Sequence, residues 1–362
     1  MISLLPMQNL VNEAPAKKNY QFIDAIRGIA MMSIVAEHCV AAGAYDFAYG
    51  TPKYWAYTIM IQLFKFGTVI FFLLAGFLIS EKFSEYSPAQ YLKRRMASTF
   101  WPWLLWSTVC LLCVLVNLYV KNRIYHDGRF NMTNILENVK LTYLYSNYWF
   151  IINFIVSLTI LLVFRRYLYS IYLGAILCLF TIFYTINIHY EWVSPWHTTA
   201  ILGFVFFLWL GAQMRRHWEW LEKSIQKIPN TLLIILNLVT FTLAIYEMLK
   251  LTPASVDPLN TLRISNILFS LAAFVLLLKI KNFKFINYLN PRQTTFGIYL
   301  IHLIIVVIVL PEIFIHFNID VPHLSVPGYL LLKLTDFVLV YGITFAIVIL
   351  LNKTRAKKLI GS

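Results

Sequence analysis

The chain has 362 residues, of which 60% are hydrophobic and only 13% are charged, and its mean hydropathy is +0.69. A soluble domain is nearer half apolar and a quarter charged, so a soluble globular fold is excluded and lipid must surround much of the chain. The formal net charge of +14 does not indicate a nucleic-acid partner, because the cations form short clusters between apolar runs, as in membrane proteins.

The apolar runs predict an all-α fold, a polytopic membrane bundle of about ten transmembrane helices, because one spanning helix needs about 20 mostly apolar residues. In chain order the predicted spans are 22–43, 57–80, 99–120, 148–165, 167–188, 198–214, 229–249, 262–279, 296–316 and 328–351. They form one transmembrane domain at 22–351, between an N-terminal tail at 1–21 and a basic C-terminal tail at 352–362.

The distribution of charge predicts the orientation of these spans. With the N-terminus inside and an even number of helices, the inner segments hold 20 Lys and Arg residues and the outer segments hold 6. Positive charge accumulates on the cytoplasmic side of membrane proteins. Both tails are therefore expected in the cytoplasm.

The cysteines predict neither a disulfide nor a metal site. All four lie inside apolar runs, and the Cys-x-x-Cys pair lacks the second pair of ligands that a zinc site needs: Cys39, Cys110, Cys113 and Cys178. We interpret them as packing residues and expect no metal.

Ionisable side chains are concentrated in the first span, where each is costly and marks a functional hypothesis. On an ideal helix Asp24, Arg27 and His38 fall within about 60° of one another, while Glu37 points to the side. Arg27 and His38 are about 16 Å apart along the axis. Simpler interpretations are an Arg27 that reaches the inner membrane edge beside Asp24, and a His38 bonded to a helix-end carbonyl. In the second span, Lys65 either pairs with Glu37 or lines a polar passage.

These residues resemble a known family. Asp24-x-x-Arg27-Gly28, then ten residues and His38, is similar to the opening of the acyltransferase-3 family of integral membrane acyltransferases, whose first helix carries Arg or Lys, ten residues and His. Further landmarks follow in the family's order: Phe71-Phe72-Leu73-Leu74-Ala75-Gly76-Phe77, Tyr91-Leu92-Lys93-Arg94-Arg95 before Phe100-Trp101-Pro102, Tyr148-Trp149-Phe150, Leu210-Gly211 before Arg215-Arg216, and Gly297-Ile298-Tyr299-Leu300-Ile301-His302.

The resemblance covers nearly the whole chain, with two departures. Ala75 stands where the family usually has Ser, and Ser98 stands where it has the second Arg of an Arg-x-x-Arg stretch. Any role for those two positions is put in doubt, whereas Arg27 and His38 match the family.

The resemblance implies transfer of an acyl group, usually acetyl, from cytoplasmic acetyl-CoA to a hydroxyl of a cell-envelope glycan or lipid-linked sugar. It also implies a bacterial inner membrane as the location. His38 is then a general base, which takes a proton from the acceptor hydroxyl and returns it to the leaving thiolate, or it carries the acyl group itself.

The other site assignments follow from the same resemblance. Arg27, assigned to both catalysis and donor binding, holds a CoA phosphate, and the other predicted donor-site residues are Lys93, Arg94, Arg95, Tyr299 and His302. For the basic run, an ordinary positive-inside flank is the simpler interpretation, and for His302 a polar residue satisfied between helices. Substrate binding is assigned to Asp24, Glu37 and Gly76, with Gly76 allowing close approach of a helix or ligand.

Two features stay open at this level. Trp192, Trp196 and His197 either contact a sugar or anchor the chain at the interface. A transporter or flippase of a lipid-linked glycan, without acyl transfer, is the competing function, but it predicts broken helices in two corresponding halves, which the sequence does not contain. A purely structural subunit leaves Arg27, His38 and Lys65 unexplained.

Overall fold

The computed structural model describes residues 20–42, 47–83, 85–281 and 283–361, and within these ranges every regular element is a helix. The α-helices are α1 (Gln21–Ala41), α2 (Pro52–Leu63), α3 (Gly67–Lys82), α4 (Pro88–Arg95), α5 (Trp101–Tyr125), α6 (Met132–Lys140), α7 (Trp149–Val163), α8 (Ile171–Tyr190), α9 (Val205–Arg216), α10 (Trp218–Lys227), α11 (Asn230–Leu251), α12 (Ile264–Ile280), α13 (Lys284–Asn287), α14 (Pro291–Ile304), α15 (Leu310–His316) and α16 (Val326–Asn352). The predicted all-α fold is confirmed, whereas most of the predicted N-terminal tail at 1–21 lies outside the described residues.

Short turns of other helix types join or interrupt these elements. In the part of the chain that the structure describes, three are π-helical: η1 (Met96–Phe100), η2 (Leu141–Tyr145) and η5 (Ile305–Val309). Four are 3₁₀ turns: η3 (Arg165–Tyr167), η4 (Ile201–Phe204), η6 (Val321–His323) and η7 (Arg355–Ile360).

Within the described residues, six continuous helical stretches are long and apolar enough to cross a membrane: Pro52–Ser80, Pro88–Tyr125, Ile171–Tyr190, Asn230–Leu251, Pro291–His316 and Val326–Asn352. A seventh span results if Met132–Tyr145 and Trp149–Val163, which meet at 49°, are taken together. The protein is thus a polytopic helical membrane protein, but the expected number of about ten spans is not confirmed. α1 carries three charged side chains, and α9 and α12 have only 12 and 17 residues.

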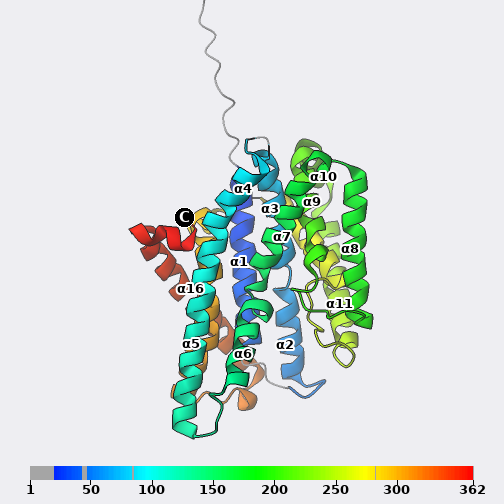
Figure 1. Ribbon diagram of the computed structural model, residues 1–362. Helices are drawn as coiled ribbons and strands as arrows, with labels where there is room; N and C mark the ends of the chain where they lie inside the picture. The colour runs from blue at the N-terminus through cyan, green and yellow to red at the C-terminus, as the bar shows by residue number, and fades with distance from the viewer. Residues whose placement is uncertain (1–19, 43–46, 84, 282, 362) are drawn as a thin grey trace, which may run out of the picture.

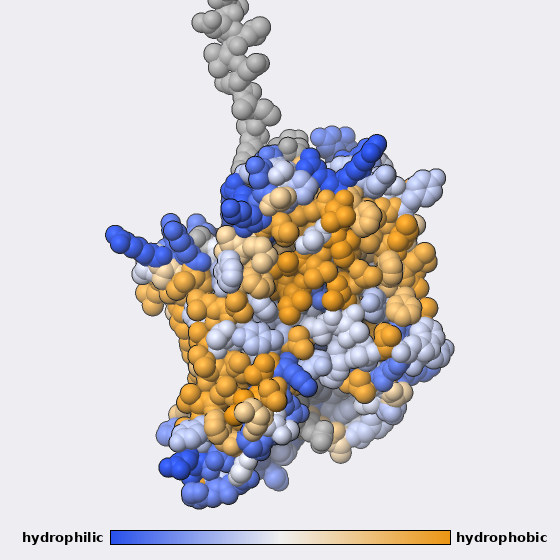
Figure 2. All heavy atoms as spheres, in the orientation of Figure 1, coloured by the Kyte–Doolittle hydropathy of each residue, from blue (hydrophilic) through white to orange (hydrophobic). Residues whose placement is uncertain are grey.

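The two ends of the bundle are polar, and the surface between them is apolar. Figure 1 shows α4, α10 and the chain's C-terminus toward the upper end, and α6 with the end of α5 toward the lower end. In the same orientation, Figure 2 shows apolar surface in the middle and hydrophilic side chains gathered at the upper and lower ends. Apolar side chains exposed on a soluble protein would be a liability, but here they face lipid.

Local sequence signals explain where several helices begin. The hydroxyl oxygens of Thr51, Ser87 and Ser325 accept hydrogen bonds from backbone N–H groups in the first turns of α2, α4 and α16. A proline occupies one of the first two positions of each of these helices, where its missing N–H and fixed φ are tolerated. These starts set the ends of long apolar helices.

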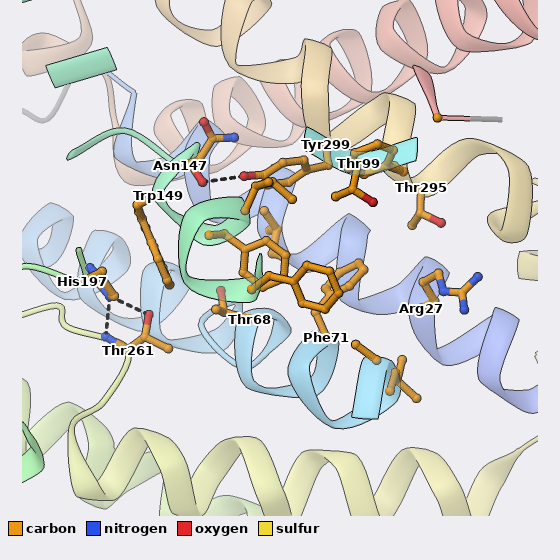
Figure 3. A pocket seen from close by; sticks show the side chains of 18 of the residues that line it. Arg27, Thr68, Phe71, Thr99, Asn147, Trp149, His197, Thr261, Thr295 and Tyr299 are labelled. Atoms are coloured by element: carbon orange, nitrogen blue, oxygen red, sulfur yellow. Dashed lines mark hydrogen bonds between the residues drawn. The ribbon is translucent and has the colours of Figure 1, made fainter. Parts of the chain in front are cut away.

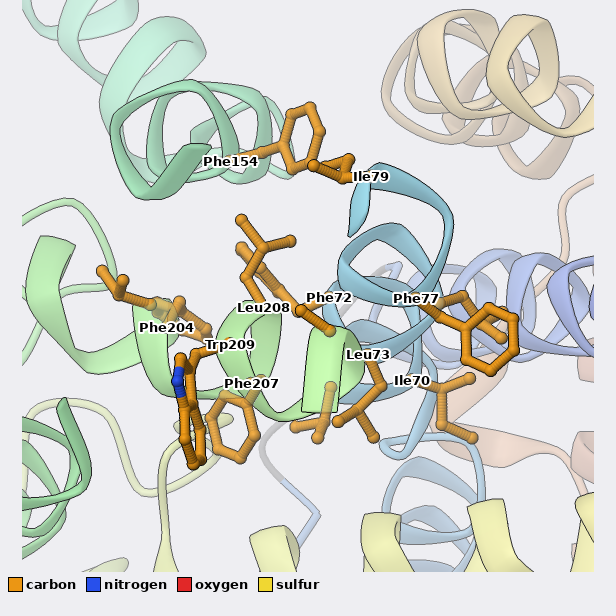
Figure 4. Close-up of a cluster of buried hydrophobic side chains, with 14 of the residues drawn as sticks. Ile70, Phe72, Leu73, Phe77, Ile79, Phe154, Phe204, Phe207, Leu208 and Trp209 are labelled. Carbon is orange, nitrogen blue, oxygen red and sulfur yellow. The ribbon is translucent and has the colours of Figure 1, made fainter. Parts of the chain in front are cut away.

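The tightest packing in the core is the crossing of α3 and α9. Figure 4 shows Phe72 and Leu73 of α3 near Phe204, the last residue of η4, and Leu208 of α9, in a cluster of buried apolar side chains. The rings of Phe72 and Phe204 lie 5.0 Å apart. Two glycines allow this approach: a Cβ on Gly76 would lie 1.9 Å from the Leu208 carbonyl oxygen, and one on Gly211 would lie 2.0 Å from the Leu73 carbonyl oxygen.

α1 lies inside the bundle, where it packs against α3, α14 and α16. Its C-terminal end is held by Lys333 of α16, whose Nζ donates to the carbonyl oxygens of Cys39 and Ala42 at 3.0 and 2.8 Å. Asp336 lies 3.3 Å from the same ammonium group, and both side chains are buried. A cation at this position satisfies carbonyl groups that have no partner within the helix. The end of α1 that carries His38 is therefore fixed.

Candidate active site

An elongated cavity of about 470 Å³ runs through the bundle, lined by side chains from α1, α3, α7, α14 and the loops before η4 and α12. Its volume lies in the range of small-molecule sites. Figure 3 shows Arg27 at one end of the cavity and His197 with Thr261 at the other, with Phe71, Trp149 and Tyr299 between them. The cavity therefore connects a cationic end to an end rich in aromatic and polar groups.

Two histidines from distant parts of the chain meet beside this cavity. His38 Nδ1 and His302 Nε2 are 2.8 Å apart, and the two rings are parallel. His302 Nδ1 lies 3.0 Å from the carbonyl oxygen of Ile298, one turn earlier in α14. A carbonyl can only accept, so His302 Nδ1 carries a proton and Nε2 of the neutral ring accepts from His38 Nδ1. Nε2 of His38 is then left with a basic lone pair.

The start of α7 contributes an amide to the same place. Asn147 Nδ2 lies 3.3 Å from His302 Nε2, and Asn147 Oδ1 is buried without a hydrogen-bond partner. The hydroxyl of Tyr299 donates to the backbone carbonyl of Asn147 over 2.7 Å, which fixes this residue against α14. Sequence reasoning missed Asn147, and its only signal was a polar residue placed immediately before the Tyr148-Trp149-Phe150 landmark.

A buried ion pair forms the wall next to His38. Lys65 Nζ lies 2.5 Å from Glu37 Oε1, and the two side chains are 10% and 12% exposed. Both residues line the cavity. Both of the alternatives considered for Lys65 are observed, because it pairs with Glu37 and also lines the cavity.

The cationic end of the cavity combines three guanidinium groups from three helical segments. Arg27 of α1, Arg95 of α4 and Arg292 of α14 line it, together with the hydroxyl residues Ser98, Thr99 and Thr295. Arg27 is held 3.1 Å from Asp24, its partner one turn earlier. Guanidinium groups surrounded by hydroxyls are suited to bind phosphate. Arg292 was not assigned from the sequence, because it precedes the apolar run of its helix and resembled a positive-inside flank.

The opposite end is built from loop residues. Trp196 and His197 line it with Tyr145, Asp257 and Thr261. His197 stacks on Trp149 with ring centroids 4.2 Å apart, and its Nε2 accepts from the backbone N–H of Thr261 at 3.2 Å. Burial lowers the pKa of His197 to about 4, so the ring is neutral near pH 7 and acts as a link between two loops.

This chain matches the family model described as an acyltransferase domain over residues 20–353, which is nearly its whole length. The chain belongs to the acyltransferase-3 family. It is accordingly a membrane acyltransferase. No curated protein and no solved structure matches the chain.

The landmarks of this acyltransferase-3 protein pair with one another in space. Gly76 of the Phe-Phe motif packs on the helix that carries Gly211. The hydroxyls of Tyr148 and Tyr299 reach across to each other's segments, where they donate to the carbonyls of Leu300 and Asn147, both over 2.7 Å. The two departures from the family pattern, Ala75 and Ser98, both line the cavity.

Several placements expected from the sequence need correction in the acyltransferase. His302 does not accompany the arginines of the donor end. It is the twelfth residue of α14, deep enough to meet His38. Gly76 serves a helix crossing and does not line the cavity. Lys93 and Arg94 are exposed outside the cavity, and only Arg95 of the basic run enters it.

Some of the remaining predicted residues line the cavity and others lie outside it. Asp24 lies outside the cavity lining and acts on Arg27, whereas Glu37 and Tyr299 line the cavity. Of the three outer residues considered as sugar contacts, Trp196 and His197 line the cavity and Trp192 does not. Trp192 is exposed and stacks on Tyr190.

Proposed function

We propose that this acyltransferase moves an acetyl group from cytoplasmic acetyl-CoA to a hydroxyl of a cell-envelope glycan or lipid-linked sugar, in a bacterial inner membrane with both termini in the cytoplasm. The observation that carries the proposal is the continuity of the cavity, because it joins three arginines, a histidine and an aromatic-lined end. The donor and the acceptor can then meet although they approach from opposite sides of the bilayer.

The donor enters at the cationic end. Arg27, Arg95 and Arg292 hold the phosphate groups of CoA through charge-assisted hydrogen bonds. The narrow pantetheine arm extends along the cavity between Phe71 and Tyr299. The thioester carbon then lies beside His38, with the nucleotide still on the cytoplasmic side.

The acceptor enters at the opposite end, where Trp196 and Tyr145 have ring centroids 5.0 Å apart. A sugar ring packs against such aromatic faces, and Asp257 and Thr261 supply polar atoms for its hydroxyls. In direct transfer, His38 Nε2 removes the proton of one hydroxyl while its oxygen attacks the thioester carbonyl. The tetrahedral intermediate collapses as the C–S bond breaks, and the thiolate takes the proton from His38.

Asn147 and His302 support this step without forming bonds to the acyl group. His302 accepts from His38 Nδ1 and stabilises the imidazolium that forms at His38, as the orienting residue of a catalytic triad does. The Nδ2 group of Asn147 donates one N–H to His302 Nε2, and its second N–H is the donor assigned to the developing oxyanion, where such a hydrogen bond lowers the barrier. In the alternative route, His38 Nε2 attacks the thioester itself and carries the acetyl group to the acceptor.

The experiment that tests the proposal uses inverted membrane vesicles containing the protein and acetyl-CoA labelled in its acetyl group. Label is followed into glycan, lipid and protein. We expect transfer by the wild type, loss of at least about a thousandfold with His38→Ala, and a raised KM for acetyl-CoA with Arg292→Ala. Label trapped on wild-type protein and missing from His38→Ala indicates the covalent route.

Two control substitutions retain activity if the proposal is right. His323→Ala and Arg355→Ala change a histidine and an arginine that are exposed and lie outside the cavity. Transfer that is equal in His38→Ala and the wild type contradicts the role of His38. The absence of transfer from any acyl-CoA, with envelope glycans supplied, would favour the transporter or flippase.

A further inference from the structure

A second cavity, of about 560 Å³, lies beside the first, between α5, the α6–η2 segment and the α14–η5 segment. We call it the side groove. Most of its lining is apolar and includes Cys110, Val114, Leu303, Val307 and Ile308. Its polar lining includes Lys121, Arg129, Tyr145 and Ser146. The donor and acceptor ends described above leave this groove without a role.

The side groove adjoins the catalytic centre. Tyr145 lines both cavities. Leu303 and Ser146 on its wall are the direct neighbours of His302 and Asn147 in the chain. A molecule in the groove thus approaches the two histidines from the flank of the bundle, while the donor approaches along its length.

Several large side chains that line the groove are exposed on the flank of the bundle, as expected of a surface in contact with lipid. Leu141, Tyr145 and Val307 are 47%, 40% and 39% exposed. The π-helical turns η2 and η5 both contribute side chains to the lining of the groove. Because a π turn inserts an extra residue, it displaces side chains from the regular helical pattern, and such turns are frequent at functional sites.

The charged side chains that line the groove are both positive. Lys121 and Arg129 line it, and within the described residues no carboxylate does. Their partners, Glu312 at 3.2 Å from Lys121 and Asp127 beside Arg129, lie outside the lining. Lys121 is eleven residues beyond Cys110 along α5, or about 16 Å. The groove is therefore apolar at its deeper end and cationic at its mouth.

We propose that the side groove binds the lipid portion of a lipid-linked acceptor, an inference that rests on the proposed function. The hydrocarbon chain lies against Val114, Leu303 and Val307, and the phosphate that joins lipid to sugar lies between Lys121 and Arg129. The sugar then passes Tyr145 toward His38. A water-soluble acceptor would have no use for an apolar groove that faces lipid, whereas a lipid phosphate matches both its apolar wall and its cationic mouth.

The test compares two acceptors that share one glycan. The first is the polyprenyl-phosphate-linked glycan extracted from the host membrane, and the second is the same glycan released from its lipid by mild acid. Protein in proteoliposomes receives labelled acetyl-CoA and either acceptor. Val307→Trp fills the groove, and we expect it to raise the KM for the lipid-linked acceptor by about tenfold or more while the KM for the released glycan stays within about twofold.

Matched variants distinguish a loss of lipid binding in the groove from a general disturbance of the fold. Val116→Trp places the same bulk on α5 at a residue that is 61% exposed and does not line the groove, and it is expected to behave as the wild type. Ile308→Trp, next to Val307 in the same π turn, is a second groove-filling variant, and Lys121→Ala with Arg129→Ala tests the cationic end. All three groove changes are expected to act on the lipid-linked acceptor.

The outcomes distinguish this inference from the proposed function. Wild-type transfer to both acceptors with no effect of the groove variants overturns the groove assignment and leaves the function standing. Equal losses with both acceptors mean that the substitutions disturb the catalytic centre, which also overturns it. If the wild type transfers to neither acceptor, the proposed function fails, and the inference fails with it.

Discussion

The orientation of His302 is set by its own helix before any partner is considered. His302 is the fourth residue after Ile298, so one imidazole nitrogen lies over a carbonyl one turn earlier. This fixes the proton on Nδ1 and directs Nε2 toward α1, where it meets His38 at 2.8 Å. The pair therefore needs no carboxylate to define its tautomers. His302 contacts His38, which lines the cavity, but does not line the cavity itself.

Replacement of His302 by Gln separates a positioning role from the donor-binding role that the sequence predicted. The substitution disturbs the acceptor for His38 Nδ1–H, and the proposed function assigns the CoA phosphates to the arginines. We therefore expect kcat to fall by about a hundredfold with the KM for acetyl-CoA unchanged. Steady-state kinetics with varied acetyl-CoA measure both. His189→Gln is the control, because His189 pairs with Glu247 away from the cavity. A raised KM with normal kcat would restore the donor-binding assignment.

Site residues that are ionisable and lie inside an apolar run could be predicted from the sequence, whereas those in flanks and loops could not. Arg27, His38 and Lys65 were singled out because charge inside a span is costly. Arg292 went unassigned because a cation just before an apolar run is expected of any inner flank. Asn147 went unassigned because one amide at the end of a loop carries no periodic signal. Only contacts between helices reveal their place in the cavity.

Among the elements, α3 and α9 approach each other closely because each carries a glycine at the crossing. Apolar helices in lipid gain little from burying more apolar surface, so association depends on close packing. Gly76 and Gly211 each face a carbonyl oxygen of the other helix. The cavity lining on α3, which includes Phe71 and Ala75, is held in position by this contact on another side of the same helix.

The crossing of α3 and α9 leaves no room for a methyl group at Gly76. Gly76→Ala must push the two helices apart, because its Cβ would lie 1.9 Å from a backbone oxygen that cannot rotate away. We expect a loss of roughly 1–3 kcal/mol in the free energy of unfolding, seen as a lower thermal midpoint in detergent. Gly342→Ala in α16 is the control, since nothing lies within 4 Å of its added Cβ and alanine favours the helix. An unchanged midpoint for Gly76→Ala would contradict the packing role.

The helical elements were predictable, and their interruptions were not. Every predicted span overlaps an observed helix, because a long run of apolar residues is recognisable in the sequence. The π turn η5 inside the predicted span 296–316 and the 3₁₀ turn η4 at 201–204 were missed. These interruptions exchange one backbone hydrogen-bond pattern for another within an apolar run, so they leave hydropathy unchanged. About ten spans were predicted, while six or seven meet the length and apolarity needed for crossing, because α1 carries three charged side chains and α9 and α12 are short.

For the whole molecule, the location of basic groups predicts how the cavity is placed in the membrane. Arg215 at the end of α9 lies over the ring of Tyr20, just before α1, at 4.7 Å, and Lys281 after α12 lies near Trp218. The start of α1 and the ends of α9 and α12 are thus at one end of the bundle, the end where Arg27 faces the cavity. If this end is cytoplasmic, as the excess of cations predicts, the arginines open toward cellular acetyl-CoA.

This orientation can be measured with single cysteines and a membrane-impermeant maleimide. Met132 at the start of α6 and Lys357 in η7 are both exposed, and they belong to opposite ends of the bundle. We expect Met132→Cys to be labelled in intact cells and Lys357→Cys only after permeabilisation. The wild type is the control, because its cysteines are buried or partly buried. The reverse labelling pattern would place the arginines outside, where acetyl-CoA cannot reach them, and the donor would then have to bind at the Trp196 end.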